Sequence, residues 1–338
     1  MKPIKKILAI ETSPHLHSGD KVEVIMRNVL YALMPVVLFS IYAFGVAALL
    51  VLLSAVLSCA VSEQLLCRWF RQNTTVNDYS VIITGLIYGL TLPPNLPLWM
   101  VFVGGIFAVV VGKFIFGGLG YNPFNPALVG RAFLQAAFPA SMTNWLSPFS
   151  ADRFTSLPSS TLTFPFASPN YDQLSSATPL ADHKFEQIST APMELLLGLS
   201  GGSTGETCAI LILLGGLYLI ARNMMNWRIP AGIFLTVLIL SSIFNCLYPD
   251  KYPNAWFMLF SGGLMLGAMF MATDPVASPI THWGCFIYGV LIGLLVVTIR
   301  FWGGMPEGVM YAILFANAVS PHIDRWIQPK AFGVRDSS

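Results

Sequence analysis

The sequence predicts an all-α polytopic membrane protein with about ten transmembrane helices. Hydrophobic residues make up 55% of the 338 residues, charged residues only 10%, and the mean hydropathy is +0.68. Soluble domains carry about 25% charged residues, so this chain cannot cover a globular surface with ions. Its apolar residues also fall in blocks of about 17–22, the length of a helix that crosses a bilayer core. A net charge of +2 leaves no basic surface for nucleic acid, so no nucleic-acid partner is expected.

The chain opens with the positively charged stretch Met1–Lys6, and only four apolar residues follow before polar Glu11. That apolar run is too short for a secretory signal, so residues 1–26 are expected to form a cytoplasmic N-terminal arm. His15 and His17 in this arm are expected to face solvent, because no third metal ligand accompanies them. The five cysteines include no Cys-x-x-Cys pair, and no metal site is predicted.

Hydropathy divides the rest of the chain into two groups of five helices separated by a long polar segment, residues 139–204. The first repeat, residues 27–138, has candidate helices at 27–44, 46–64, 80–93, 98–116 and 125–138. The second repeat, residues 205–322, has candidate helices at 207–221, 230–247, 255–272, 284–300 and 307–320, and residues 323–338 form a tail. Two helices run into prolines, which end a helix because proline has no N–H.

The two halves resemble each other. The stretch Thr84–Pro93 reads like Ser261–Pro275. In each half a Gly-containing apolar helix that ends in a basic residue follows, and then a Gly-Gly turn, as in Lys113–Gly118 and Arg300–Gly304. Gly and Pro are frequent in membrane helices, which is the competing explanation, but three shared features in one order favour a repeat. Because five is odd, the second half would start on the opposite face, so the sequence predicts an inverted 5+5 repeat.

Basic residues indicate the orientation of the helices. With the N-terminus inside, 14 of the 18 Lys and Arg residues, Arg131 among them, fall on the inner side or at inner helix ends. The remaining four are Arg153, Lys184, Lys251 and Arg300. This asymmetry is the positive-inside pattern. Both termini are therefore expected in the cytoplasm, and residues 139–204 on the outer face.

The outer segment contains Asp172–Thr178, with the sequence Asp-Gln-Leu-Ser-Ser-Ala-Thr, followed by Pro179. Pro179 pushes Thr178 toward an extended backbone. The hydroxyl of Thr178 is therefore expected to project from the chain, where a modifying enzyme can reach it. The nearby glycine-rich stretch Gly201–Thr207 lacks the Gly-Lys-Ser/Thr ending of a phosphate-binding loop. We interpret it as a flexible entry to the next helix, with Ser203 or Thr204 as the cap and Glu206 near the helix start.

A second polar block, Gly117–Ala127, opens the fifth helix with two Asn and two Pro residues beside glycines. Asn125 is expected to be the N-cap and Pro126 the first helical residue. The alternative is that the amides of Asn122 and Asn125 line a cavity at the membrane edge. Arg131 and Asp274 lie near apolar spans, where ionisable groups are costly and seldom face lipid. They pair structurally, sit at the water boundary or border an ion path, and the sequence leaves these interpretations open.

These motifs resemble the family formed by the D subunit of the Rnf redox pump and the B subunit of the Na⁺-translocating NADH:quinone reductase. The resemblance covers almost the whole chain and is most specific at Thr178 and at Asn122–Ala127. It also includes the Thr273–Pro275 turn and the closing span Tyr311–Trp326. Ser176 stands where the family most often has Gly. The short N-terminal arm favours the D-type branch over the B-type branch.

The resemblance implies a membrane core like that of urea transporters, built as the inverted repeat argued above. It implies that FMN is joined to Thr178 by a phosphoester, which makes the chain a flavoprotein and a phosphoprotein. It also implies that a second, non-covalent flavin, riboflavin, lies near Asn122 and Asn125 toward the inner side. No catalytic side chain is implied, since the cofactor supplies the redox chemistry.

On this resemblance the chain is a subunit of a redox-driven ion translocase in the bacterial inner membrane and is inactive alone. It relays electrons between ferredoxin and NAD, coupled to Na⁺ or H⁺ translocation, with iron–sulfur and flavin subunits as partners and a flavin transferase for maturation. Two rivals lack flavin altogether: a small-solute channel on the same scaffold and a purely structural membrane subunit. Nothing in the sequence distinguishes Na⁺ from H⁺.

Overall fold

The computed structural model describes residues 22–71, 78–167, 175–206 and 208–328. Helices make up nearly all of the regular structure of these residues, which confirms the all-α prediction. The one sheet among them pairs two-residue strands, β1 (Trp145–Leu146) and β2 (Ser175–Ser176), antiparallel. Three parts of the predictions lie outside the described residues: most of the N-terminal arm with His15 and His17, most of the C-terminal tail, and Asp172–Leu174.

The first half contains helices at all five predicted places. They are α1 (Val22–Phe44), α2 (Val46–Trp69), α3 (Ser80–Leu90), α4 (Leu98–Val109) with its π-helical continuation η2 (Val110–Phe114), and α5 (Pro126–Ala137). Helix α3 ends at Leu90 because the chain turns into Pro93 and Pro94, which cannot continue the helical hydrogen-bond ladder. A short helix, α6 (Pro139–Met142), follows α5.

The polar segment carries the short helices α7 (Pro179–Ala181), η3 (Asp182–Glu186) and α8 (Pro192–Leu197). The second half then consists of α9 (Ala209–Ala221), α10 (Arg228–Leu247), α11 (Ala255–Phe260), α12 (Leu264–Leu266), η4 (Gly267–Met271), α13 (His282–Trp302) and α14 (Val309–Trp326). The single helix predicted at 255–272 is wrong. It breaks between α11 and α12, where Gly262 has a φ of 65°, a conformation that suits glycine because it has no Cβ.

The predicted cap of the helix after the glycine-rich stretch is also wrong. Helix α9 begins after Cys208, which makes no side-chain cap. Thr204 instead donates its hydroxyl to the carbonyl of Gly89 at 2.8 Å, and the N–H groups of Thr204 and Gly205 bond to carbonyls of Leu92 and Leu90. The stretch therefore supplies donors to the unsatisfied C-terminal end of α3, a need that every helix terminus has.

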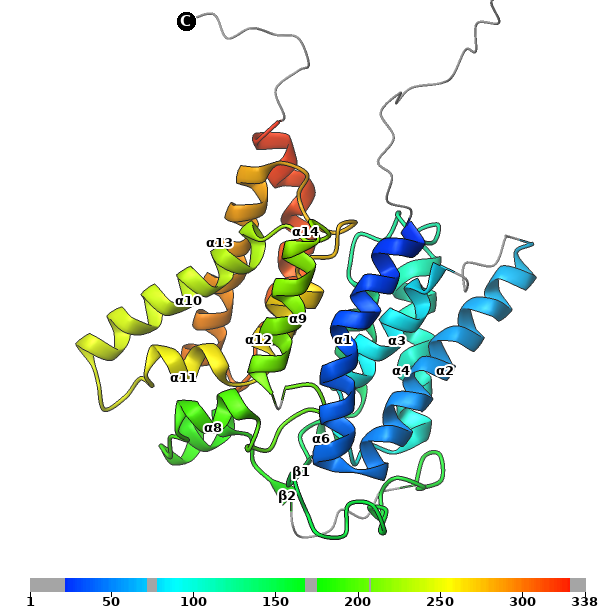
Figure 1. Cartoon of the computed structure of the whole chain (residues 1–338), viewed down its shortest axis with the longest axis horizontal. Coiled ribbons are helices and arrows are strands. Elements are labelled where there is room, and N and C mark those ends of the chain that lie inside the picture. Colours follow the sequence, from blue (N-terminus) through cyan, green and yellow to red (C-terminus); the bar gives the residue numbers. More distant parts are fainter. Residues whose placement is uncertain (1–21, 72–77, 168–174, 207, 329–338) are drawn as a thin grey trace, which may run out of the picture.

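Four helices of the described chain, α1, α2, α10 and α13, are long and apolar enough to cross a membrane. They support a multi-pass membrane protein. Figure 1 shows α1 to α4 on one side and α9 to α14 on the other, with α1 packed against α9 between them. Within the halves, α2 packs on α3 and α4, and α10 packs on α13. The start of α1 and the end of α14 lie at one end, and β1, β2 and α8 lie at the opposite end (Figure 1).

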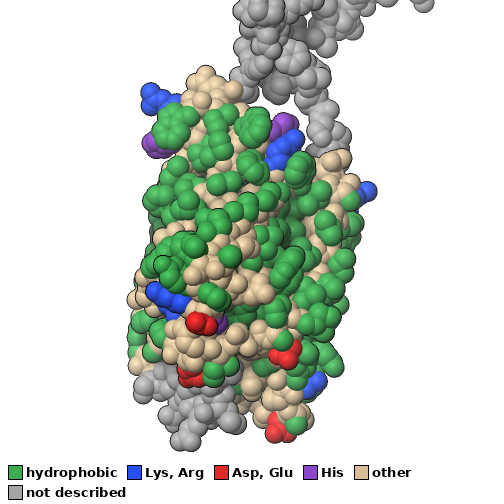
Figure 2. Space-filling model, turned by 90° about the vertical axis from the view of Figure 1, so that its left-hand side faces the viewer, with side chains coloured by type: hydrophobic (Ala, Val, Ile, Leu, Met, Phe, Trp, Pro, Cys, Tyr) green, Lys and Arg blue, Asp and Glu red, His purple; other side chains and the backbone are tan. Residues whose placement is uncertain are grey.

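The outer surface of the bundle is apolar. Figure 2 shows one side face, where hydrophobic side chains cover the middle and the charged side chains lie toward the two ends. Large exposed hydrophobic residues such as Leu38, Leu53, Leu57 and Leu65 lie on α1 and α2. An apolar belt with polar ends is the surface that a bilayer solvates.

Candidate functional site

Thr178 lies at the end of the bundle that carries β1 and β2, directly before α7. Its backbone is extended, with φ −78° and ψ 150°, as Pro179 at the first helical position requires. Its hydroxyl accepts a hydrogen bond from the N–H of Ala181 at 3.3 Å. The expectation of an openly projecting hydroxyl is not met, because Thr178 is only 9% exposed. The hydroxyl is therefore reached through a cavity.

That cavity, which we name the outer cavity, has a volume of about 470 Å³, within the range of about 300–1,000 Å³ that small-molecule sites occupy. Its lining comes from both halves and from the segment between them. The first half contributes Arg131 and Gln135, the middle segment Trp145 and Thr178, and the second half Glu206, Gly262, Glu307 and Tyr311. The cavity thus brings Thr178 against residues that lie far from it in the sequence.

One wall of the outer cavity is a buried charged cluster. Arg131 Nη2 donates to Glu307 Oε2 at 2.8 Å, and Arg131 Nη1 lies 3.7 Å from Glu206 Oε1. The side chains of Arg131 and Glu206 are 9% and 6% exposed. Arg131, which we counted with the inner charges, therefore lies inside the bundle and pairs across the two halves. The structural-pairing interpretation of Arg131 is confirmed.

The glycine turn between α11 and α12 closes this wall. The N–H of Gly263 donates to Glu307 Oε1, and a Cβ at Gly263 would lie 2.8 Å from that oxygen and 3.0 Å from Glu206 Oε1. Only a residue without a side chain allows the two carboxylates to approach the backbone so closely. Behind the turn, Arg300 is buried and donates to the carbonyls of Met258 and Ser261.

Lys184 holds the Thr178 segment on the second half. Its Nζ donates to the carbonyls of Arg300 and Met305, at 3.0 and 2.9 Å, and to that of Gly303. These carbonyls lie in the last turn of α13 and in the loop that follows it, where a cation also meets the negative end of the helix dipole. Leu180 adds an apolar contact in a small cluster with Leu195 and Phe257.

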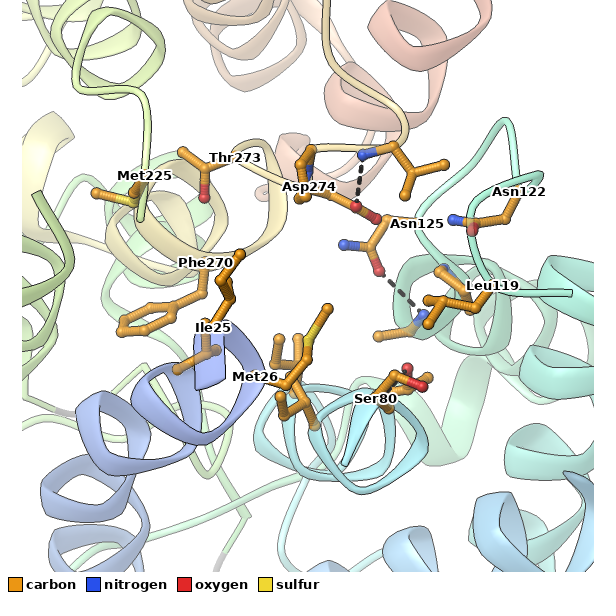
Figure 3. Close-up of a pocket in the computed structure, with 18 of the residues that line it drawn as sticks. Ile25, Met26, Ser80, Leu119, Asn122, Asn125, Met225, Phe270, Thr273 and Asp274 are labelled. Carbon is orange, nitrogen blue, oxygen red and sulfur yellow. Dashed lines mark hydrogen bonds between the residues drawn. The ribbon is translucent and has the colours of Figure 1, made fainter. Parts of the chain in front are cut away.

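Asn122 and Asn125 meet at a second cavity, the inner cavity, at the end of the bundle where α1 starts (Figure 3). Asn125 Oδ1 accepts from the N–H of Ala127 at 3.0 Å, so the predicted N-cap is confirmed. Its Nδ2 donates to the carbonyl of Met271 at 3.2 Å, and Asn122 Nδ2 donates to the carbonyl of Phe124 at 3.1 Å. Both side chains are buried.

The inner cavity has a volume of about 120 Å³, below the usual range of about 300–1,000 Å³. A flavin would need it to widen. Ser80, Lys113 and Asp274 line it as well. Asp274 accepts from the N–H of Val276 at 3.1 Å (Figure 3), which leaves all of its interpretations open. Lys113 is buried and bonds both carboxylate oxygens of Glu63, at 2.8 and 2.9 Å.

The sequence interpretation missed Glu307, assigned Glu206 to a helix start, and did not connect Glu63 with Lys113. A usable signal was present, because acidic residues beside apolar spans are rare and seldom lack a partner. Their partners could not be found, since Arg131 and Glu307 are 176 residues apart in the chain. Among the described residues, no three His, Cys, Asp or Glu side chains are grouped so that they could hold a metal ion.

The sequence pattern that defines the NQR2, RnfD, RnfE family matches residues 9–333. The chain belongs to this family. It is 39% identical over 341 aligned residues to the D subunit of the ion-translocating oxidoreductase complex of Alcanivorax borkumensis, with 98% of each chain covered. It is 38% identical to the D subunit of the proton-translocating ferredoxin:NAD(+) oxidoreductase complex of Clostridium ljungdahlii, again with 98% of each chain covered.

A third relative is the D subunit of the Na(+)-translocating ferredoxin:NAD(+) oxidoreductase complex of Acetobacterium woodii, 38% identical with 97% of this chain and 96% of that one covered. These relatives confirm the resemblance to the D-type branch. The proton-translocating and the Na⁺-translocating relative are equally similar to this chain. Overall sequence similarity therefore does not indicate whether Na⁺ or H⁺ is the coupling ion.

Proposed function

We propose that this chain is the D-type membrane subunit of an ion-translocating ferredoxin:NAD oxidoreductase complex and relays electrons within it, coupled to Na⁺ or H⁺ translocation. The observation that carries the proposal is the match, over 96–98% of the chain lengths, to three relatives that bear the name of this subunit. The partners are the other subunits of the complex, to which we assign iron–sulfur and flavin centres. The subunit is inactive by itself.

The redox group that we propose is FMN, joined through its phosphate to the hydroxyl of Thr178. The residues present fit such a group. The outer cavity is large enough for a flavin, Thr178 lines it, and Arg131 contributes a cation to the same wall. When bound, the flavin supplies one-electron chemistry, and the chain supplies its position and its electrostatic surroundings. The burial of Thr178 implies that the flavin transferase acts before the Thr178 segment closes on α13.

We propose that riboflavin occupies a widened form of the inner cavity, with Asn122 and Asn125 as contacts. Amides suit a flavin ring because one side chain offers both donors and acceptors. Two facts support the assignment: the side chains lie together in the cavity wall, and the family resemblance includes their motif.

We also propose that the two halves form the inverted 5+5 repeat and that the Thr178 segment lies outside the cytoplasm. The pairing of α2 with α4 has its counterpart in the pairing of α10 with α13, the second and fourth main helices of each half. Helix α1 begins, and helix α14 ends, at the same end of the bundle (Figure 1). The Thr178 segment lies at the opposite end. Among the described basic residues, Arg27 lies near the start of α1 and Arg325 in the last turn of α14, where the positive-inside rule expects a cytoplasmic face.

Flavin fluorescence on a denaturing gel tests the cofactor assignment. The wild-type subunit, purified with its complex, should fluoresce after denaturation, and Thr178→Ala should be dark. Thr143→Ala is the matched control, since Thr143 lines the same cavity and its variant should remain fluorescent. A fluorescent Thr178→Ala subunit contradicts the assignment. A dark wild-type subunit favours the flavin-free channel or structural subunit instead.

A further inference from the structure

Glu206 is the least satisfied charged side chain in the wall of the outer cavity. Its side chain is 6% exposed, and its Oε1 is buried without a hydrogen-bond donor. Its Oε2 receives a long bond of 3.4 Å from the N–H of Ser203. A buried carboxylate that lacks donors is strongly disfavoured in its ionised form.

Glu307, in contrast to Glu206, accepts two hydrogen bonds. It holds the 2.8 Å bond from Arg131 and the bond from the N–H of Gly263, while Arg131 stays 3.7 Å from Glu206. One oxygen of each carboxyl lies within 3.0 Å of the same point, the Cβ position of Gly263. Two carboxyls this close do not both ionise readily.

The hydrogen-bond donors around the pair favour a proton on Glu206. Arg131 on α5 is the one cation among the described side chains that line the cavity, and Tyr311 on α14 lines it as well. Arg300, on α13, donates to two backbone carbonyls behind the turn, and its charge acts on both carboxyls without a hydrogen bond to Glu206. Neither guanidinium donates a hydrogen bond to Glu206, so an ionised Glu206 would keep a buried oxygen without a donor. A sodium ion would have to sit beside the guanidinium, which disfavours it relative to a proton.

We propose that Glu206 and Glu307 form a proton-sharing carboxyl pair in the wall of the outer cavity, with one proton held on Glu206 at rest. The cavity connects this pair to the ligand attached at Thr178. A negative charge added to that ligand raises the proton affinity of the pair, so a second proton is taken up from water. This last link rests on the proposed function, whereas the resting proton does not.

Infrared spectroscopy of the carboxyl C=O stretch tests the resting proton without any flavin. The complex is prepared with Thr178→Ala, and Glu206→Gln, Glu307→Gln or Glu194→Gln is added to it. A buried carboxylic-acid band should be present in the parent and lost with either Glu206→Gln or Glu307→Gln. It should persist with Glu194→Gln, which changes an exposed glutamate of α8.

A band that survives both Glu206→Gln and Glu307→Gln overturns the proposal. A band that disappears on adding Na⁺ at constant pH also overturns it, in favour of a sodium site. Glu206→Asp keeps a carboxyl and should restore a shifted band, which separates loss of the proton from failure to fold.

The link to electron transfer is tested on the flavin-containing complex, reduced with dithionite in weak buffer with a pH indicator. Wild type should take up more protons per electron than Glu206→Gln, and equal uptake overturns the link. If no flavin is found on Thr178 but the infrared band behaves as described, the proposed cofactor fails and the carboxyl pair stands.

Discussion

The bond between Arg131 and Glu307 joins the two halves of the molecule, and Arg131→Met removes it. The substitution keeps the length of the side chain but leaves the carboxyl groups of Glu206 and Glu307 without the guanidinium of Arg131. Breaking a buried ion pair from one side costs about 3–5 kcal/mol. Glu307 is 20% exposed, which allows some solvation and places the expected loss near the lower end, at about 3 kcal/mol.

Denaturant unfolding of the purified subunit in detergent micelles, followed by tryptophan fluorescence, measures this loss. The double variant Arg131→Met with Glu307→Gln removes both charges of the bond and should recover about 2 kcal/mol of the loss, because no unpaired carboxylate remains at position 307. Arg222→Met, at an exposed site at the end of α9, is the control and should change stability by less than about 0.5 kcal/mol. A single variant as stable as the control, or a double variant no better than the single one, refutes the reasoning.

Three further predictions concern the surroundings of the outer cavity. Gly263→Ala should lower the thermal unfolding midpoint, because its Cβ would lie 2.8 Å from a carboxylate oxygen, whereas Gly304→Ala, with nothing within 4 Å, should not. Lys184→Met should speed proteolysis of the Thr178 segment, since three carbonyl contacts are lost; Lys251→Met is the control, and equal rates would contradict the anchoring role. Burial lowers the pKa of His183 from its ordinary 6.5, so the folded segment favours the neutral ring. The resulting contribution to the stability of the segment is present above pH 6.5 and decreases as the pH falls below it. Below that pH, proteolysis of the Thr178 segment should therefore quicken in wild type but not in His183→Gln.

Much of the fold could be predicted because it depends on local signals. Helix positions follow from apolar blocks, the N-cap at Asn125 from its neighbour Pro126, and the extended backbone at Thr178 from Pro179. These effects act within a few residues of the chain. The break between α11 and α12 was less visible, since Gly262 needs its left-handed conformation only once the carboxyl pair packs against the turn.

The site itself depends on contacts between distant parts of the chain. Thr204 was expected to cap its own helix, yet it caps α3 at Gly89, which lies 115 residues away. Nothing in the sequence indicates that Thr178 and Arg131 line one cavity. The sequence motif around Thr178 predicted a flavin there through the family resemblance. The charged cluster of Arg131, Glu206 and Glu307 could not be predicted, because it forms only when the two halves pack together.

Mass spectrometry of the tryptic peptide Phe154–Lys184 from the purified complex tests the flavin assignment most directly. The peptide should carry the added mass of FMN less one water, with the fragment ions placing it on Thr178. An unmodified peptide, or a flavin on another serine or threonine of the same peptide, would contradict it.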